Sequence, residues 1–175
     1  MHTLLLLFTL LAPGPSAAPD CSGAAGQRAA SDLATAVGAA AQASGTALPV
    51  PRGTRISSSY GWRTHPVSGR RQFHTGVDFA LGRGSNVVSP GAGRVTFAGW
   101  AGGYGRLVEV TLGDGTVVTY AHLQDYAGMQ VGTAVQAGTV VGHVNSSGTS
   151  TGDHLHLEVV DGRGVRQDPV TWFRY

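Results

Sequence analysis

The sequence predicts an all-β domain of mostly antiparallel sheet over residues 53–175. Three observations lead to this fold class: short runs of β-branched residues recur, glycines separate them, and no long run shows the period of an amphipathic helix. The whole chain holds 27 glycines among its 175 residues, a frequency that suits many tight turns. Frequent short strands between such turns are typical of all-β domains.

The first half of the domain is expected to contain short strands separated by loops. Residues 55–60 are predicted to form the first strand and residues 64–71 a loop. A glycine-rich turn at residues 82–85 comes before short apolar runs at 87–88 and 94–98. These runs are long enough for strands and too short for helices.

The second half begins with a predicted β-hairpin. Residues 107–112 and 116–120 flank a Gly-Asp-Gly turn, which is the sequence pattern of two antiparallel strands. His122 is expected just beyond the second strand, facing a cleft. Residues 131–144 alternate turns with short β-branched runs, and the polar residues 145–152 are predicted to form a loop.

The last predicted strand carries two histidines. In residues 153–160 every second position from 155 to 159 is apolar, and this alternation predicts a strand rather than a helix. His154, His156 and Glu158 therefore share the opposite face of that strand. Neutral imidazole is the commonest protein ligand for a transition metal, so a histidine pair placed in this way can hold a metal or transfer protons.

A second segment, residues 74–78, supplies two more candidate ligands. Gly76 and its β-branched neighbours disfavour a helix, and on an extended chain His74 and Asp78 share one face. Gly76 between them has no side chain to block an ion. Together with His156 they provide three protein ligands, and catalytic zinc keeps its fourth position for water. The two segments therefore suggest a zinc site.

The motifs around these residues resemble the lysostaphin/LytM-type zinc metallopeptidases, which cut peptide cross-links in bacterial cell-wall peptidoglycan. The resemblance runs from about residue 53 to residue 173. It is carried by the motifs SYGWR at 59–63, HTGVD at 74–78, GGYG at 102–105, YAHL at 120–123, the glycine-flanked tract 148–152 before the histidine pair, and DPVTW at 168–172.

The resemblance implies a duplicated hybrid motif-like catalytic domain that binds one zinc ion per chain. It assigns His74, Asp78 and His156 as zinc ligands and His154 and His122 as the catalytic pair. A zinc-activated water would attack the peptide bond, with His154 as its base and His122 stabilising the oxyanion. The reverse assignment of the two histidines is also open. The expected partner is peptidoglycan, and the chain is expected to act as a monomer.

The loop before the first zinc histidine points to one class of cross-link. Members that cut glycyl-glycine bonds carry a tyrosine there, and residues 64–73 contain none. Directly cross-linked stem peptides are therefore the expected substrate. Two further departures from the family pattern are Asp153, where a small residue or proline is usual, and Leu157, which replaces a frequent phenylalanine.

Two other functions make different demands on the sequence. A catalytically inactive relative that binds the wall or activates an amidase would lack zinc ligands, whereas this chain has the full set. A biotin or lipoate carrier needs a lysine, and all twelve basic residues are arginines. The sequence leaves two interpretations of Glu158 open: it orients a ligand histidine, or it is an exposed strand residue.

The charge distribution argues against a nucleic-acid partner and leaves the role of three arginines open. The net charge is +2 and the arginines are dispersed without an aromatic platform, so no nucleic-acid partner is expected. Arg63, Arg70 and Arg71 come shortly before the first zinc segment. They either steer an anionic wall polymer or are ordinary solvated charges, and the second interpretation is favoured.

The start of the chain predicts export. Residues 1–18 have a leucine-rich core too short to span a bilayer, followed by small residues that suit cleavage, as in a secretory signal peptide. A buried amino-terminal helix is the alternative. No stable membrane insertion is expected, and the protein is predicted to be secreted or to lie in the cell envelope.

Residues 19–52 are expected to form a tether. They are rich in alanine, glycine and serine, and a short helix at 31–43 would have few large side chains to bury. Cys21 is the chain's one cysteine, so no intrachain disulfide can form; a lipid anchor there has a poor signal, and the residue is taken as incidental. Residues 53–175 are long enough for one domain with its own core.

Overall fold

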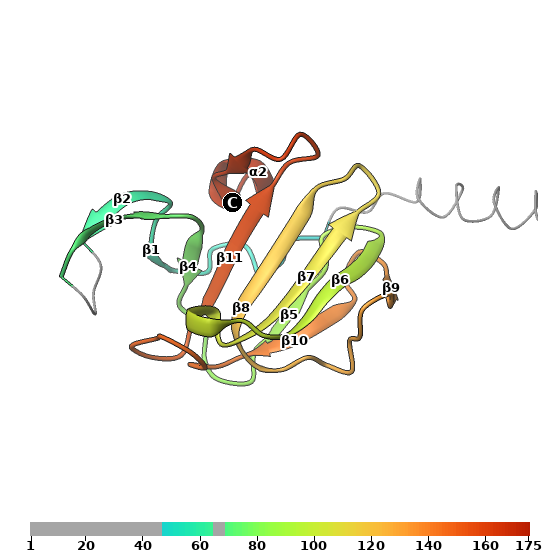
Figure 1. The fold of residues 1–175 in the computed structure, drawn as a ribbon, viewed down its shortest axis with the longest axis horizontal. Helices are drawn as coiled ribbons and strands as arrows, with labels where there is room; N and C mark the ends of the chain where they lie inside the picture. Colours follow the sequence, from blue (N-terminus) through green and yellow to red (C-terminus); the bar gives the residue numbers. More distant parts are fainter. Residues whose placement is uncertain (1–46, 65–68) are drawn as a thin grey trace, which may run out of the picture. The chain divides into compact units, whose positions relative to one another are not determined.

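The computed structural model describes residues 47–64 and 69–175, which all belong to one compact unit. The predicted signal peptide, most of the predicted tether and His65 lie outside the described residues. Within the described ranges no helix has both the length and the apolar character needed to cross a membrane. The fold is mostly antiparallel β-sheet, as the sequence predicts (Figure 1).

The described part of the chain contains twelve strands, one 3-10 turn and one short helix. In chain order the strands are β1 (Ile56–Ser58), β2 (Gly61–Thr64), β3 (Arg71–His74), β4 (Val77–Phe79), β5 (Asn86–Val88), β6 (Gly93–Trp100), β7 (Arg106–Leu112), β8 (Val117–Asp125), β9 (Ala134–Val135), β10 (Val140–Val144), β11 (Leu155–Val160) and β12 (Arg166–Gln167). The 3-10 turn η1 (Gly102–Tyr104) follows β6, and the helix α2 (Pro169–Phe173) follows β12.

Ten of these strands form one sheet in which β11 lies between β4 and β8 (Figure 1). The order of the main path is β1-β4-β11-β8-β7-β6-β9, and β10 joins β8 and β5 at one side. The register places His156 of β11 opposite Asp78 of β4 and opposite Ala121 of β8. The backbone pairing of β4 and β11 therefore already places two of the candidate ligands side by side.

The strands β2 and β3 form a separate two-stranded hairpin beside this sheet. His74 ends β3, the chain bends at residues 75–76, and Asp78 follows on β4. The expectation of one continuous extended segment is thus wrong, because the bend moves the chain from one sheet to the other. Gly76 permits this bend: a Cβ there would lie 2.3 Å from the carbonyl oxygen of Leu157.

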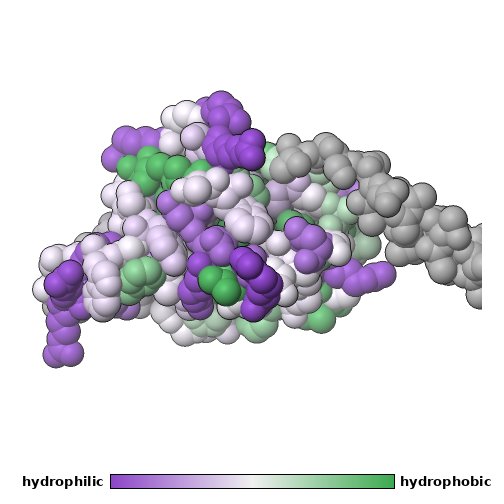
Figure 2. Space-filling view, turned by 90° about the horizontal axis from the view of Figure 1, so that it is seen from above, coloured by the Kyte–Doolittle hydropathy of each residue, from purple (hydrophilic) through white to green (hydrophobic). Residues whose placement is uncertain are grey.

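The core lies on one face of the main sheet and consists mainly of valine, leucine and aromatic side chains. Its largest fully buried members are Tyr120, Phe79, Leu123, Leu155 and Leu157. Alternation on β11 sends both leucines into this core, so its histidine and glutamate project from the other face. On the surface seen in Figure 2, hydrophobic residues are scattered among hydrophilic and neutral ones.

Two further features differ from the sequence prediction. The hairpin of β7 and β8 is present, but β8 continues to Asp125, so His122 lies inside the strand rather than beyond it. The helix α2 was not predicted, although its start has a recognisable signal. Asp168 caps it by accepting a hydrogen bond from the Val170 amide at 2.9 Å, and Pro169 occupies the first helical position.

Candidate metal centre

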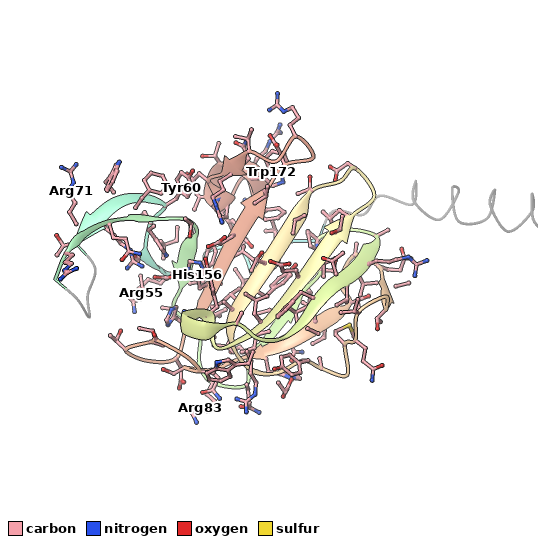
Figure 3. The ribbon with its side chains drawn as sticks, in the orientation of Figure 1. Arg55, Tyr60, Arg71, Arg83, His156 and Trp172 are labelled. Atoms are coloured by element: carbon pink, nitrogen blue, oxygen red, sulfur yellow. The ribbon has the colours of Figure 1, made fainter. Side chains whose placement is uncertain are left out.

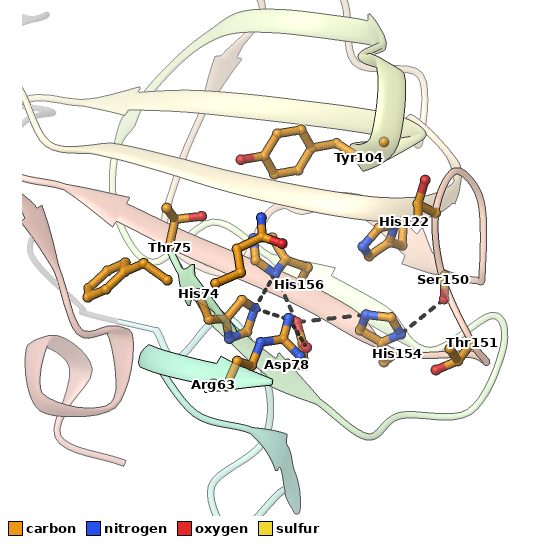
Figure 4. Close-up of a pocket in the computed structure, with 14 residues that line it drawn as sticks. Arg63, His74, Thr75, Asp78, Tyr104, His122, Ser150, Thr151, His154 and His156 are labelled. Carbon is orange, nitrogen blue, oxygen red and sulfur yellow. Dashed lines mark hydrogen bonds and ion pairs between the residues drawn. The ribbon is translucent and has the colours of Figure 1, made fainter. Parts of the chain in front are cut away.

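Three candidate ligands from two sheets meet at one point. Asp78 and His156 are cross-strand partners on β4 and β11, and such partners project from the same face of a sheet. The hairpin brings His74 to them from the side through its pairing with Gly61. All three side chains are buried, and Figure 4 shows them directed toward one another.

The spacing of their ligand atoms suits a small tetrahedral cation. His156 Nδ1 lies 2.8 Å from Asp78 Oδ1 and 3.0 Å from His74 Nε2, and His74 Nε2 lies 3.2 Å from the same carboxylate oxygen. Zinc binds nitrogen and oxygen ligands at roughly 2.0–2.1 Å, which places neighbouring ligand atoms of a tetrahedral site about 3.3 Å apart. The three atoms are thus close to the separation that zinc imposes.

The other nitrogen of each ring has an oxygen acceptor, which fixes the neutral tautomer. His74 Nδ1 donates to the carbonyl oxygen of Ser59 at 2.9 Å, and His156 Nε2 donates to Glu158 Oε1 at 3.0 Å. Their remaining nitrogens then present lone pairs to Asp78 Oδ1. Two lone pairs and a carboxylate oxygen at this spacing repel one another unless a positive charge lies among them. The donor set therefore fits a metal cation.

The protonation equilibria of the centre show the same preference for positive charge. Burial raises the pKa of Asp78, but when the two rings are protonated instead of metal-bound, their hydrogen bonds and positive charges outweigh burial and bring the net pKa well below the ordinary value. Burial lowers the pKa of His156, yet its hydrogen bonds with Asp78 and Glu158 raise the pKa overall. The centre therefore stabilises a cation at the point where the three ligand atoms meet.

His154 and His122, the predicted catalytic pair, lie beside this point. Each directs Nδ1 to a backbone carbonyl, His154 to Gly152 at 2.8 Å and His122 to Ser147 at 2.7 Å. Because carbonyl oxygens only accept, Nδ1 carries the proton and Nε2 is the free acceptor in each neutral ring. His154 Nε2 is 3.7 Å from Asp78 Oδ1. The two ring centroids are 4.7 Å apart.

The backbone of β8 is distorted where it carries His122. This residue has a φ of 59°, which is rare for a residue other than glycine. Such strain is concentrated at functional sites, where it re-aims a side chain that a regular strand would direct elsewhere. Burial lowers the pKa of His122 to about 4, so the imidazole is neutral at physiological pH.

Glu158 orients His156 from the far side of the ring. Its side chain is buried, so the interpretation as an exposed strand residue is wrong. Besides His156, Oε1 accepts hydrogen bonds from Thr75 and from the Tyr104 hydroxyl at 2.8 Å, and Oε2 pairs with Arg166. Burial raises the pKa of Glu158, but its hydrogen bonds, that of His156 foremost, bring it down to about 2. The carboxylate therefore stays ionised.

Sequence reasoning gave no role to three of these partners, Thr75, Tyr104 and Arg166. Thr75 and Tyr104 lie within motifs that carry the family resemblance, but their contacts with Glu158 span 83 and 54 residues. Only the folded chain shows that pairing. Arg166 on β12 is brought to β11 by a tight turn, and no sequence signal marks it.

The centre lies at the floor of an open cleft of about 380 Å³ (Figure 4). Its wall includes the hairpin, the turn η1 and the loop before β11. The lining residues are Arg63, Gln72, Phe73, His74, Thr75, Asp78, Gly103, Tyr104, His122, Thr149, Ser150, Thr151, His154 and His156. An extended peptide can therefore reach the three ligand atoms and both catalytic candidates from solvent.

The remaining candidate residues divide between the cleft and the outer surface. Arg63 lines the cleft, whereas Arg71 is exposed and lies over the ring of Trp62 at 5.3 Å from its centroid. His143 lies outside the cleft wall, where it pairs with Asp125 at 2.6 Å. It is thus a half-buried residue away from the candidate centre.

The comparisons with known proteins agree with this geometry. The sequence model of peptidase family M23 matches residues 72–169, the segment that holds all five histidine and aspartate candidates. The catalytic domain of the antimicrobial peptidase lysostaphin from Staphylococcus simulans has a similar structure, with a TM-score of 0.63 and 30% sequence identity. That match covers 70% of this chain and 93% of the lysostaphin domain.

Curated relatives are longer than this chain. The DD-carboxypeptidase/endopeptidase Mpg of Neisseria meningitidis serogroup B is 42% identical over 119 residues, which cover 67% of this chain and 27% of that protein. The peptidoglycan DD-endopeptidase ShyC of Vibrio cholerae is 30% identical over 118 residues, again 67% of this chain and 27% of the relative. Each match thus covers about two thirds of this chain and about a quarter of the relative. The chain belongs to peptidase family M23.

Proposed function

We propose that this protein is a zinc-dependent endopeptidase that hydrolyses peptide cross-links of bacterial peptidoglycan. The observation that carries the proposal is the convergence of His74 Nε2, Asp78 Oδ1 and His156 Nδ1 at the floor of an open cleft. The names of the relatives Mpg and ShyC, which describe endopeptidases and in one case peptidoglycan, support the substrate class.

One zinc ion per chain would be held by His74, Asp78 and His156. When bound, zinc supplies a strongly acidified water and polarises the carbonyl group that is attacked. The protein supplies the rest: Ser59 and Glu158 fix the ring orientations of the two ligand histidines, and the cleft positions the peptide.

The proton transfers of hydrolysis fall to His154 and His122. His154 would accept the proton of the attacking water at its free Nε2 and pass it to the leaving amine as the C–N bond breaks. The water's hydroxyl group ends on the carbonyl carbon, so the products are a carboxylic acid and an amine. In this assignment neutral His122 would accept a hydrogen bond from the attacking water at its free Nε2. In the reverse assignment His122 would take the water's proton in place of His154, and its Nε2–H would then donate to the oxygen that gains negative charge before the proton passes to the leaving amine.

The proposed substrates are stem peptides that are cross-linked directly. The loop at residues 64–73 lacks the tyrosine of the glycyl-glycine-cutting members, which favours bonds between stem peptides over glycine bridges. Secretion follows from the predicted signal peptide at residues 1–18 and stays part of this proposal, as does the monomeric state.

A catalytically inactive, wall-binding relative is the alternative function. Nothing in the described residues favours it, because the three ligand positions and both proton-transfer positions carry competent side chains. The two functions predict different behaviour toward the polymer: the enzyme releases soluble fragments from it, whereas the binding protein sediments with it unchanged.

The test uses the full chain, loaded with zinc, on purified peptidoglycan sacculi. We expect one bound zinc per chain by elemental analysis, a fall in turbidity, and released muropeptides whose masses show one water added per cross-link. Sacculi that are bound but unchanged by a zinc-loaded protein would contradict the proposal and support the inactive alternative.

A further inference from the structure

The cleft contains one cationic side chain with a weak partner. Apart from its histidines, the lining carries two charged residues, Arg63 and Asp78. Arg63 Nη2 lies 3.6 Å from Asp78 Oδ2, which is an ion pair but too long for a hydrogen bond. Its side chain is 24% exposed, and within residues 47–64 and 69–175 Asp78 is its one ion-pair partner. The guanidinium thus keeps N–H donors available to a ligand in the cleft.

The two oxygens of Asp78 face different neighbours. Oδ1 points to His74 and His156, where the proposed metal would lie, and Oδ2 points to Arg63 (Figure 4). A metal ion at Oδ1 would neutralise most of the charge that now balances Arg63. The guanidinium would then be a positive charge beside a divalent cation, and a site with that charge binds anions.

No other carboxylate of this region can serve as the counter-ion. Glu158 is buried and already engaged by three hydrogen-bond donors and by Arg166. In the sequence, Asp78 is the first acidic residue after Asp32, so the whole hairpin and the loop at its tip carry only positive charge. The anion that completes the site must therefore come from the substrate.

The position of Arg63 restricts where that anion lies in a peptide. Arg63 contacts Oδ2 of the same carboxylate whose Oδ1 faces the proposed metal position. An anion bound by Arg63 therefore lies close to the scissile bond and must belong to one of the two residues that form it. On the acyl side the backbone carboxyl group is consumed in the amide itself. The residue that contributes the amine keeps its own α-carboxyl group, two bonds from the nitrogen. Among the backbone carboxyl groups of the two residues, only that one is both free and close enough.

We propose that Arg63 binds the free α-carboxylate of the residue whose amine leaves, and so selects the bonds that are cut. This inference rests on the proposed function and deepens it. It predicts cleavage of cross-links formed by a diamino acid with a free carboxylate, and of the last residue of an uncross-linked stem peptide. Neutral glycine bridges, which carry no carboxylate at this position, would be poor substrates.

The experiment compares two substrates that differ in one group: diacetyl-L-Lys-D-Ala-D-Ala and its C-terminal amide. The zinc-loaded full chain is expected to hydrolyse the carboxylate form at least about tenfold more efficiently in kcat/KM, since a hydrogen bond to a charged group is lost in the amide. Arg63→Gln should remove most of this preference by slowing the carboxylate substrate alone. Arg63→Lys should retain part of it.

Arg71→Gln is the matched control, because it removes the same charge from the same hairpin outside the cleft wall (Figure 3). It should leave the preference unchanged. A binding measurement separates recognition from turnover: in a His154→Ala background, calorimetry should show tighter binding of the carboxylate form, and Arg63→Gln should abolish that difference. The zinc content of every variant is measured alongside.

Two results would overturn the inference. Equal kcat/KM values of the unsubstituted protein for both substrates would show that the protein does not recognise the carboxylate. A loss of zinc from Arg63→Gln together with an equal loss on both substrates would show that Arg63 serves only to hold Asp78. In either case release of muropeptides from sacculi would leave the proposed function standing, whereas a protein without zinc and without any hydrolysis would overturn both.

Discussion

Each histidine of the centre has one ring nitrogen held by an oxygen acceptor and the other directed into the cleft. Three of these acceptors are backbone carbonyls, of Ser59, Ser147 and Gly152, and the fourth is the Glu158 carboxylate. Backbone acceptors leave no sequence signature. The sequence could therefore identify the four histidines as candidate site residues, but it could not show which nitrogen of each ring faces the proposed metal position.

The division between ligands and proton-transfer residues predicts two different variants. His156→Ala should lose zinc and activity together, because it removes a ligand atom 2.8 Å from Asp78 Oδ1. His154→Ala should keep zinc and lose at least about a hundredfold in turnover, the usual contribution of a general base. His143→Ala, outside the cleft, is the control for both. Elemental analysis and sacculus turbidity give the two readouts, and an active, zinc-free His156→Ala protein would refute the assignment.

Glu158→Gln should weaken zinc binding without removing a ligand. Loss of an outer carboxylate that orients a metal-binding histidine typically costs about 10–100-fold in metal affinity. Titration against a competing chelator measures this directly. Glu109→Gln, a carboxylate on β7 outside the cleft wall, should have the affinity of the unsubstituted protein. Equal affinities for all three proteins would show that Glu158 does not act through His156.

Asp161 predicts an acid-sensitive contribution to stability away from the cleft. Hydrogen bonds from the Val165 amide, Arg163 and Gln167 lower its pKa from 3.8 to about 2. A carboxyl group with a lowered folded-state pKa stabilises the fold above its unfolded-state pKa and loses that effect as the pH falls through the folded value. In urea unfolding, the advantage over Asp161→Asn should be full above about pH 4 and shrink toward pH 2. A difference independent of pH would contradict this.

At the scale of elements, period-two alternation identified β11 and a Gly-Asp-Gly turn identified the hairpin of β7 and β8, because both signals are local. The position of His122 could not be predicted in the same way. Its left-handed backbone lies within β8, and only the packing of β8 against its neighbours can hold a non-glycine residue there. The bend at residues 75–76 likewise depends on a partner 81 positions away, Leu157.

That bend gives a prediction for Gly76→Ala. The added Cβ would lie 2.3 Å from the Leu157 carbonyl oxygen and 3.0 Å from His156 Cε1, so β4 and β11 must separate. We expect a loss of about 1–3 kcal/mol in the free energy of unfolding, together with weaker zinc binding. Gly82→Ala, where a Cβ meets nothing within 4 Å, is the control. Chemical denaturation measures the stabilities, and equal midpoints would contradict the close approach.

At the scale of the whole molecule, the centre joins two sheets that otherwise pair separately. His74 comes from the β2–β3 hairpin, and Asp78 and His156 come from the main sheet. The sequence could predict the all-β class and name His74, Asp78 and His156 as candidate ligands from short motifs. It could not show that these three residues belong to different sheets, because that depends on strand pairings more than 75 residues apart, as between Asp78 and His156.

Removal of the metal should therefore lower the stability of the domain as well as its activity. A ligand that binds only the folded state stabilises it by roughly 2.7 kcal/mol when its free concentration is 100 times its dissociation constant. Chelation should lower the melting temperature, and added zinc should restore both stability and turnover. Magnesium, which prefers oxygen ligands, serves as the control cation. A melting temperature insensitive to chelation and zinc would contradict a structural link between the sheets.

The most direct test of the account is a crystal structure of the zinc-loaded protein with anomalous diffraction measured on both sides of the zinc absorption edge. We predict one anomalous peak in the cleft, within bonding distance of His74 Nε2, Asp78 Oδ1 and His156 Nδ1, with His154 and His122 nearby but not bonded. A peak held by a different set of side chains, or no peak in a protein that hydrolyses sacculi, would contradict it.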